Sequence, residues 1–384
     1  MSIMEYLHVV TATVILFAIA LILGKSKTLA DYILISWLFL FLFNVAGFFV
    51  MERNAFPLNG LKDDLLQFSD ALIFLHGPMF LLYTVTLTRP AFRFRLIYLL
   101  QLLPFVTVLT LMVTGSYYSQ SPYIPLIETI LKICSLLIYI IPVYLQLLKH
   151  RKNVKNIFSN AEQKYLGWLF ILSNGILLLW LVLFITTLIN IAGSMGRMAY
   201  DGVTLKVSTD SFLIFMCYFG VRQPALYETE DFTISDEDQK ITLEAIYEAR
   251  VGKGQELAVV KYQKSGLATD VADEIHKRLL LLMETAKPYL DDNLTLFSLA
   301  EMSGIRPNHL SQVINLLEGK SFFDFINYYR VEEVKKIIDS NQLNHFTLLG
   351  IAFECGFNSK AAFNRGFKKF TGMTPSEFKN NRTG

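Results

Sequence analysis

Two patterns of hydrophobic residues divide this chain. Up to residue 221 the apolar residues form long runs with few charges, whereas beyond residue 268 they recur at helical spacing. Runs of about 17 to 25 mainly apolar residues are typical of helices that cross a membrane. We expect seven such spans, of which the third and seventh are the shortest: Tyr6–Gly24, Tyr32–Met51, Ala71–Leu87, Leu96–Thr114, Ile124–Leu148, Tyr165–Ile191 and Val207–Val221.

The last hundred residues carry two helix-turn-helix patterns in series. In the first, Ala300 is followed four residues later by Gly304, which lacks a Cβ and so permits a left-handed turn. The second repeats this plan with Ala352 and Gly356, and its turn is one residue longer. A continuous helix is predicted between them, from residue 321 to residue 340. The apolar stripes that would fix the second helix of each unit are Leu310, Val313, Ile314 and Leu317, and then Phe363 and Phe367.

The segment between these regions, residues 222–284, is predicted to be a partly helical linker. Its first part is acidic, and glycines interrupt its second part. The acidic stretch could be a solvated linker or a mask that competes with DNA. A helix is expected from Ala272 to Tyr289. We therefore expect an all-α chain with three parts: a membrane domain (1–221), a linker (222–284) and a double helix-turn-helix domain (285–384).

The distribution of Lys and Arg predicts the orientation in the membrane. Cytoplasmic loops carry an excess of these residues. The loops on one side of the seven spans hold ten of them, and those on the other side hold four. This predicts a multi-pass membrane protein with the N-terminus outside and the C-terminal domain in the cytoplasm. The ten are Lys25, Lys27, Arg89, Arg93, Arg95, Lys149, Arg151, Lys152, Lys155 and Lys164; the four are Arg53, Lys62, Arg197 and Lys206.

Composition adds limits on the chemistry. Hydrophobic residues make up 53% of the 384 residues, which is high for a soluble protein, and the net charge is only +2. After Gly356, however, six basic residues accompany the single acid Glu377. The three cysteines are scattered, which argues against a disulfide framework or a zinc site. We find no Gly-rich phosphate loop, metal-ligand cluster or nucleophile motif, so we expect neither an enzyme nor a cofactor.

Ionisable residues within membrane spans are costly and often functional. Each can equally be structural, by bonding a neighbouring helix or by reaching the membrane boundary. Glu128 and Lys132 lie four residues apart and could pair on one helix face. With Asp210 and His76, these residues are our candidates for a signal-sensing cavity.

The residues from about Lys287 to Arg382 resemble the DNA-binding domain of AraC/XylS-type transcription regulators. The whole chain is similar to members of that family with a multispanning membrane domain in front. It lacks the soluble sugar-binding barrel of the arabinose regulator, so no sugar ligand is implied. The motifs that carry the resemblance are Leu299-Ala300 to Gly304, His309-Leu310-Ser311, Phe325-Ile326-Asn327 to Arg330-Val331, Ile351-Ala352 with Gly356-Phe357-Asn358-Ser359, Phe363 to Phe367-Lys368-Lys369, and Thr371-Gly372 with Thr374-Pro375.

The resemblance implies that two recognition helices enter successive major grooves of double-stranded DNA. Asn and Gln can bond adenine edges, and Arg can bond guanine. By position, the base-reading candidates are Asn308, Ser311 and Gln312 in the first unit, and Lys360, Ala361, Asn364 and Arg365 in the second. The phosphate candidates, which would fix the register, are Arg306, Ser359, Lys368 and Lys369. For Arg306, Lys368 and Lys369, ordinary solvated charge is the alternative.

These patterns favour a membrane-bound, one-component transcription regulator whose sequence-specific DNA binding is controlled by a signal at the membrane domain. The expected partners are DNA, the lipid bilayer, RNA polymerase, a second copy of the chain and an unknown signal ligand. The alternative is a membrane receptor or transporter whose helical cytoplasmic tail binds a protein.

Overall fold

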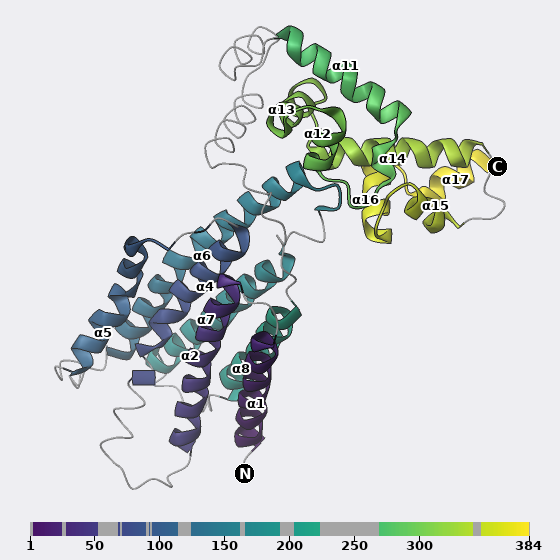
Figure 1. Cartoon of the computed structure of the whole chain (residues 1–384). Coiled ribbons are helices and arrows are strands. Elements are labelled where there is room, and N and C mark those ends of the chain that lie inside the picture. The colour runs from purple at the N-terminus through teal and green to yellow at the C-terminus, as the bar shows by residue number, and fades with distance from the viewer. Residues whose placement is uncertain are drawn as a thin grey trace. The chain divides into compact units, whose positions relative to one another are not determined.

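The computed structural model describes residues 3–24, 28–52, 68–69, 71–89, 92, 94–113, 124–161, 166–192, 203–222, 269–340 and 347–383. Regular structure in these ranges is helical, apart from one isolated β-bridge between Phe158 and Thr295, in agreement with the all-α prediction. The chain divides into two compact units (Figure 1). Unit 1 contains Met1–Leu148 and Leu166–Phe232, and unit 2 contains Lys149–Tyr165 and Thr233–Gly384.

Each of the seven apolar segments predicted in the first part of the chain coincides with helix in the described residues. The fourth segment combines a 3-10 helix with an α-helix. The helices are α1 (Ile3–Leu23), α2 (Leu29–Glu52), α4 (Ile73–Thr88), η1 (Leu96–Leu102) with α5 (Leu103–Val113), α6 (Ile124–Ile157), α7 (Gly167–Ala192) and α8 (Val203–Arg222).

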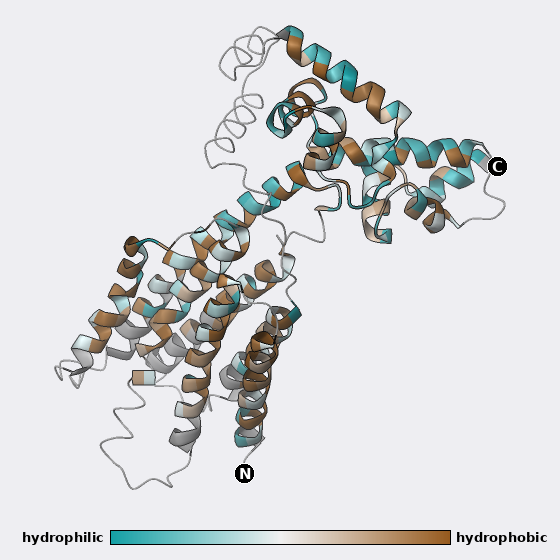
Figure 2. Cartoon of the chain, viewed as in Figure 1, coloured by the Kyte–Doolittle hydropathy of each residue, from teal (hydrophilic) through white to brown (hydrophobic). Residues whose placement is uncertain are grey.

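Unit 1 is a helical bundle with an apolar interior and an apolar exterior. Helix α1 packs against α2 and α8, α2 packs against α4, and α7 packs against α8. Trp37 is buried in the bundle and stacks on Phe80 with ring centroids 5.5 Å apart. Large apolar side chains such as Phe17 and Ile138 are nevertheless exposed, and hydrophobic residues dominate the helices throughout this unit (Figure 2).

Three helical stretches among the described residues are long and apolar enough to cross a membrane. They are Glu5–Leu23, Leu29–Gly47 and Ile130–Ile157. The apolar helices Ile73–Thr88, Leu96–Thr110 and Gly167–Leu179 are shorter than a full span. By length and composition, three spans are therefore supported, and the number seven stays a prediction.

Unit 2 contains the two predicted helix-turn-helix pairs and the helix that joins them. Its helices are α11 (Thr269–Thr285), η5 (Pro288–Leu290), α12 (Leu296–Ser303), α13 (Pro307–Leu317), α14 (Phe322–Asp339), α15 (Leu348–Glu354), α16 (Lys360–Thr371) and α17 (Pro375–Thr383). The predicted connecting helix matches α14, which begins after the N-cap Ser321, whose hydroxyl accepts from the backbone N–H of Asp324.

Two separate hydrophobic cores hold the two pairs. The first is built by α11, α12, α13 and the start of α14, and the second by the rest of α14 with α15, α16 and α17. On α14, Phe325 lies in the first core and Val334 in the second. Helix α14 therefore links two independently packed halves, each of which presents one helix-turn-helix.

Two features of unit 2 differ from the predicted division of the chain. Helix α11, which we placed in the linker, buries Ala272, Leu279 and Met283 in the first core. Residues Lys149–Tyr165, which we placed in the membrane domain, group with the helix-turn-helix pairs because Phe158, Ser159 and Ala161 are buried there. The acidic segment 223–250 lies outside the described residues.

Candidate nucleic-acid interface

The first helix-turn-helix is formed by α12 and α13. Gly304 ends α12 with φ +66°, the left-handed conformation that glycine adopts without strain. Pro307 then occupies the first turn of α13, where its missing N–H costs nothing. Leu310 and Ile314 on α13 are fully buried and fix the helix against the core. The opposite face of α13 is thereby left for a partner.

Among the candidates on the first unit, Asn308 and Gln312 lie one turn apart on α13 and are partly exposed. Arg306 is exposed at the N-cap position of this helix, where a cation can reach a phosphate. Ser311 does not share this placement. It is buried, and Asn315 donates to its backbone oxygen at 2.7 Å. Burial does not favour contact of Ser311 with a base, and its role in base reading stays a prediction.

The second helix-turn-helix is formed by α15 and α16. The hydroxyl of Ser359 accepts from the backbone N–H of Ala362 at 3.1 Å and caps α16. Phe363 and Phe367 are buried in the second core. Ser359 thus has a structural role as an N-cap, while its own O–H proton is still available to a phosphate oxygen.

The outward face of α16 is a polar stripe that we call the α16 stripe. Its members recur at spacings of four residues, so they share one side of the helix. All of them are exposed, and they combine three cations with one amide and one small residue. The α16 stripe consists of Lys360, Ala361, Asn364, Arg365 and Lys368.

Lys369 differs from its neighbour Lys368. Its ammonium nitrogen lies 2.6 Å from a carboxylate oxygen of Asp324 at the start of α14. This ion pair joins α16 to α14, whereas no such pair is seen for Lys368 among the described residues. Contact of Lys369 with phosphate stays a prediction, and it would compete with Asp324.

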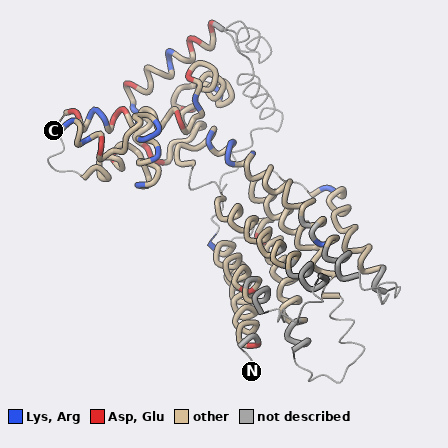
Figure 3. Tube along the Cα trace, turned by 180° about the vertical axis from the view of Figure 1, so that it is seen from behind, with Lys and Arg blue, Asp and Glu red and all other residues tan. Residues whose placement is uncertain are grey.

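Both acidic and basic residues occur along the helices of unit 2 (Figure 3). Several of the carboxylates are paired with basic side chains within the unit. The carboxylate of Glu333 accepts hydrogen bonds from Lys287 at 2.6 Å and from Tyr289 at 3.2 Å. Burial by itself would raise the pKa of Glu333, but these hydrogen bonds and the charge of Lys287 outweigh burial and hold the pKa below its usual value. Glu318 is similar, since hydrogen bonds from Lys320 and His276 outweigh burial and lower its pKa. Paired acids oppose the approach of a polyanion less than free ones would.

Two of the four sensing candidates, Asp210 and His76, have polar partners among the described residues of unit 1. The carboxylate of Asp210 on α8 lies 3.0 Å from Nδ1 of His8 on α1, and both side chains are buried. His76 accepts from the indole N–H of Trp37 at 3.0 Å, contacts Asn44 at 2.9 Å and stacks on Phe41. The amide nitrogen of Asn44 lies next to Nε2 of His76, while the amide oxygen of Asn44 accepts from the hydroxyl of Ser69 at 2.9 Å.

The predicted Glu128–Lys132 pair is not tested, because the side chain of Glu128 lies outside the described residues. Lys132 itself is buried on α6. Sequence reasoning missed His8, although an imidazole in the first apolar run was a visible signal. It also missed Trp37, which has no polar signature until its N–H is seen to bond His76.

Comparison with known proteins connects unit 2 to a family. Residues 299–381 match a family described as a helix-turn-helix domain, of the AraC type. The chain is 34% identical over 94 residues to an HTH-type transcriptional regulator of Staphylococcus aureus (strain COL), a match that covers 24% of this chain and 12% of that protein. It is 25% identical over 104 residues to the HTH-type transcriptional regulator GlxA of Rhizobium meliloti, covering 27% and 31% of the two chains.

A third relative is the HTH-type transcriptional regulator YijO of Escherichia coli, 30% identical over 102 residues, which are 26% of this chain and 35% of that protein. The chain thus spans about a third or less of the length of these relatives. No solved structure matches. With two capped helix pairs and an exposed α16 stripe, unit 2 of this chain contains a helix-turn-helix DNA-binding domain of the kind found in transcriptional regulators.

Proposed function

We propose that this protein is a membrane-bound, one-component transcription regulator that binds a specific DNA sequence under the control of a signal at unit 1. The observation that carries the proposal is the combination, in one chain, of two helix-turn-helix pairs with apolar helices long enough to cross a bilayer. A regulator of this kind requires no enzyme activity. The unknown signal would act by changing the arrangement of the cytoplasmic part of the chain.

DNA reading is assigned to the outward faces of α13 and α16. Asn308 and Gln312 would read one major groove, and Asn364 and Arg365 the next, since these side chains are partly or fully exposed. Arg306, Lys360 and Lys368 would contact phosphates and Ala361 would allow close approach to the groove. A second copy of the chain would double the contacts, and RNA polymerase is the partner that transcription control implies.

Membrane insertion is supported by the surface of unit 1. Phe17, Leu96 and Ile138 each expose more than half of their side chain. Such apolar surface is costly in water but suits lipid. The excess of Lys and Arg in alternate loops favours an outside N-terminus and a cytoplasmic unit 2.

Two linked measurements test the proposal. Green fluorescent protein fused after Arg222 should fluoresce, because it would lie in the cytoplasm, whereas alkaline phosphatase fused there should be inactive. DNA crosslinked to the full chain in washed membranes should then be enriched in discrete loci, and enrichment should fall in the Arg365→Ala/Lys368→Ala variant. A full chain found in the soluble fraction would contradict the membrane part. Crosslinked DNA without preferred loci would contradict the regulator.

A further inference from the structure

The two halves of unit 2 meet at a junction around Arg330. This residue lies on α14 between the two cores and is 2% exposed. Its Nε donates to the backbone oxygen of Tyr289 at 2.7 Å, and its Nη2 donates to that of Asp291 at 2.7 Å. Arg330 therefore anchors the segment before α12 to the helix that joins the halves.

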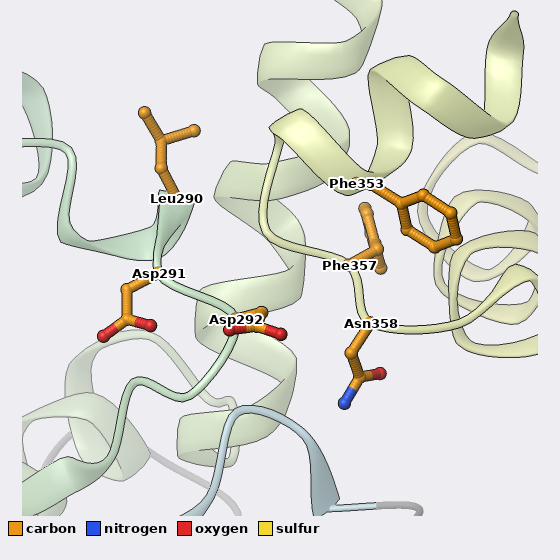
Figure 4. A pocket seen from close by; sticks show the side chains of 6 residues that line it. All are labelled: Leu290, Asp291, Asp292, Phe353, Phe357 and Asn358. Carbon is orange, nitrogen blue, oxygen red and sulfur yellow. The ribbon is translucent and has the colours of Figure 1, made fainter.

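The turn of the second half reaches the same junction. Gly356 has φ +88°, and a Cβ on it would overlap the backbone oxygen of Tyr289 and approach Nε of Arg330. Beside this contact lies an open hollow of about 470 Å³ (Figure 4), lined on one side by Leu290, Asp291 and Asp292 and on the other by Phe353, Phe357 and Asn358. The two halves thus contact each other beside an open hollow.

A third segment completes the junction: the turn 158–161 that follows α6. The backbone N–H of Ser159 donates to Leu294 at 3.1 Å, and Phe158 forms a β-bridge with Thr295. Asn160 donates to the side chain of Asn293 at 3.3 Å.

Ser159 also accepts from Arg330. Its hydroxyl oxygen lies 3.1 Å from Nη2 and its backbone oxygen 3.4 Å from Nη1. Burial lowers the pKa of Arg330 to about 10, against the opposing charges of Asp292 and Asp291. A buried guanidinium that loses acceptors is strongly destabilised, so removal of the turn would loosen Arg330 and with it the junction.

We propose that the surface formed by Arg330 and residues 291–295 is a docking site for the turn 158–161, and that docking fixes the angle between the two helix-turn-helix halves. The turn is a positioning element that touches no DNA. Because α6 is continuous from Ile124 to Ile157, movement of this helix would be transmitted to the turn. This regulation rests on the proposed function.

The docking itself is tested by a disulfide in the full chain, in membranes. Asn160→Cys and Asn293→Cys are combined, and a protease site is placed between residues 223 and 268. After oxidation and cleavage, the two fragments should stay joined on a non-reducing gel and separate on reduction. Each single variant controls for crosslinking to Cys134, Cys217 or Cys355 and should give separate fragments. Separate fragments from the double variant would overturn the inference.

The effect on DNA reading is tested by the spacing of the half-sites. The probe is the DNA site selected by the wild-type chain in nanodiscs, with and without one base pair inserted between half-sites. Ala161→Glu introduces a carboxylate at a fully buried position and should undock the turn. Discrimination is the ratio of the affinities for the two probes. We expect this ratio to be at least about tenfold smaller for the variant than for the wild-type chain, roughly the effect of one mismatched base pair. Asn156→Glu adds the same charge one turn earlier, at a partly exposed position, and should keep the discrimination.

Unchanged discrimination in Ala161→Glu would overturn the inference, even if Arg365→Ala weakens binding and so supports the proposed function. If the wild-type chain selects no site, the proposed function fails, and the disulfide result still decides whether the turn docks.

Discussion

Arg365 is the residue of the α16 stripe with the most specific chemistry, because a guanidinium can form two bonds to a guanine edge. We expect Arg365→Ala to weaken binding to the selected site by about 1–3 kcal/mol and to relax the preference at one base position. Binding of the wild-type and variant chains to sites with single base changes measures both effects. Equal weakening at every sequence would show that Arg365 contacts phosphate instead.

Lys368 and Lys369 are adjacent in sequence but differ in their surroundings. Only Lys369 is held by Asp324. Lys368→Ala should weaken binding uniformly and reduce the slope of log affinity against log salt by about 1, as expected for one lost phosphate contact. Lys369→Ala is the matched control and should leave the slope unchanged. Equal changes in slope would mean that DNA displaces Asp324.

Glu333 links the pH dependence of stability to one ion pair. The pKa of Glu333 is lower in the folded state than its value near 4.5 in the unfolded chain. Its contribution to the free energy of unfolding is therefore complete above the unfolded pKa and is lost as the pH falls through the folded pKa. In the fragment 269–384, which contains both cores, Glu333→Gln should cost about 1 kcal/mol of unfolding free energy at pH 7. The cost should shrink towards pH 3.

Glu332→Gln serves as the control for this titration. Glu332 is 33% exposed and pairs with Lys335 one turn along the same helix, so its loss should change stability little. Denaturant unfolding between pH 3 and pH 7 gives the comparison. Equal pH dependence in wild type and Glu333→Gln would refute the role assigned to Glu333.

At the residue scale, the sequence predicted types of side chain better than their partners. The resemblance to AraC/XylS-type domains implies Asn308, Asn364 and Arg365 as base-reading residues, and the structure exposes them at least in part. The surroundings of Ser311 and Lys369 could not be predicted, for different reasons. Ser311 lies at the edge of the buried face of α13, and the partner of Lys369 is 45 residues away, on a helix whose packing no local pattern shows.

At the scale of elements, two of the tight turns in unit 2 should respond differently to an added methyl group. Gly356 and Gly319 both have positive φ, but only Gly356 has backbone atoms where a Cβ would lie. Gly356→Ala should destabilise the fragment 269–384 by at least about 3 kcal/mol, because overlap adds to the conformational strain. Gly319→Ala should cost only about 1–2 kcal/mol. Thermal unfolding of the two variants compares them, and similar losses would show that the Gly356 contact is loose.

Most helices of unit 2 were predictable because their signals are local. The N-caps Thr295, Ser321 and Thr347 and the apolar stripes after them fix the helix starts within a few residues. The turn 158–161 could not be predicted in this way. It is four residues long and has no periodic pattern, and its role depends on contacts with residues more than 130 positions later.

At the scale of the molecule, the continuous helix α6 connects the proposed membrane domain to the helix-turn-helix domain along the chain. The 34 residues of α6 would extend about 50 Å, well beyond the roughly 30 Å of a bilayer core. A helix of this length can cross a membrane and still project from it. Charge patterns predicted which end projects into the cytoplasm, whereas the signal and the DNA site depend on partners that leave no mark in a single sequence.

Selection of DNA by the full chain tests most sharply whether this protein is a sequence-specific regulator. The protein in nanodiscs is mixed with a fragment library of its own genome at low and at physiological salt, and the retained DNA is sequenced. We expect a shared site with two half-sites about one helical turn, or roughly 10 base pairs, apart. This site should be retained at the higher salt, where non-specific binding is lost. Retained fragments that share no sequence at either salt would contradict sequence-specific regulation.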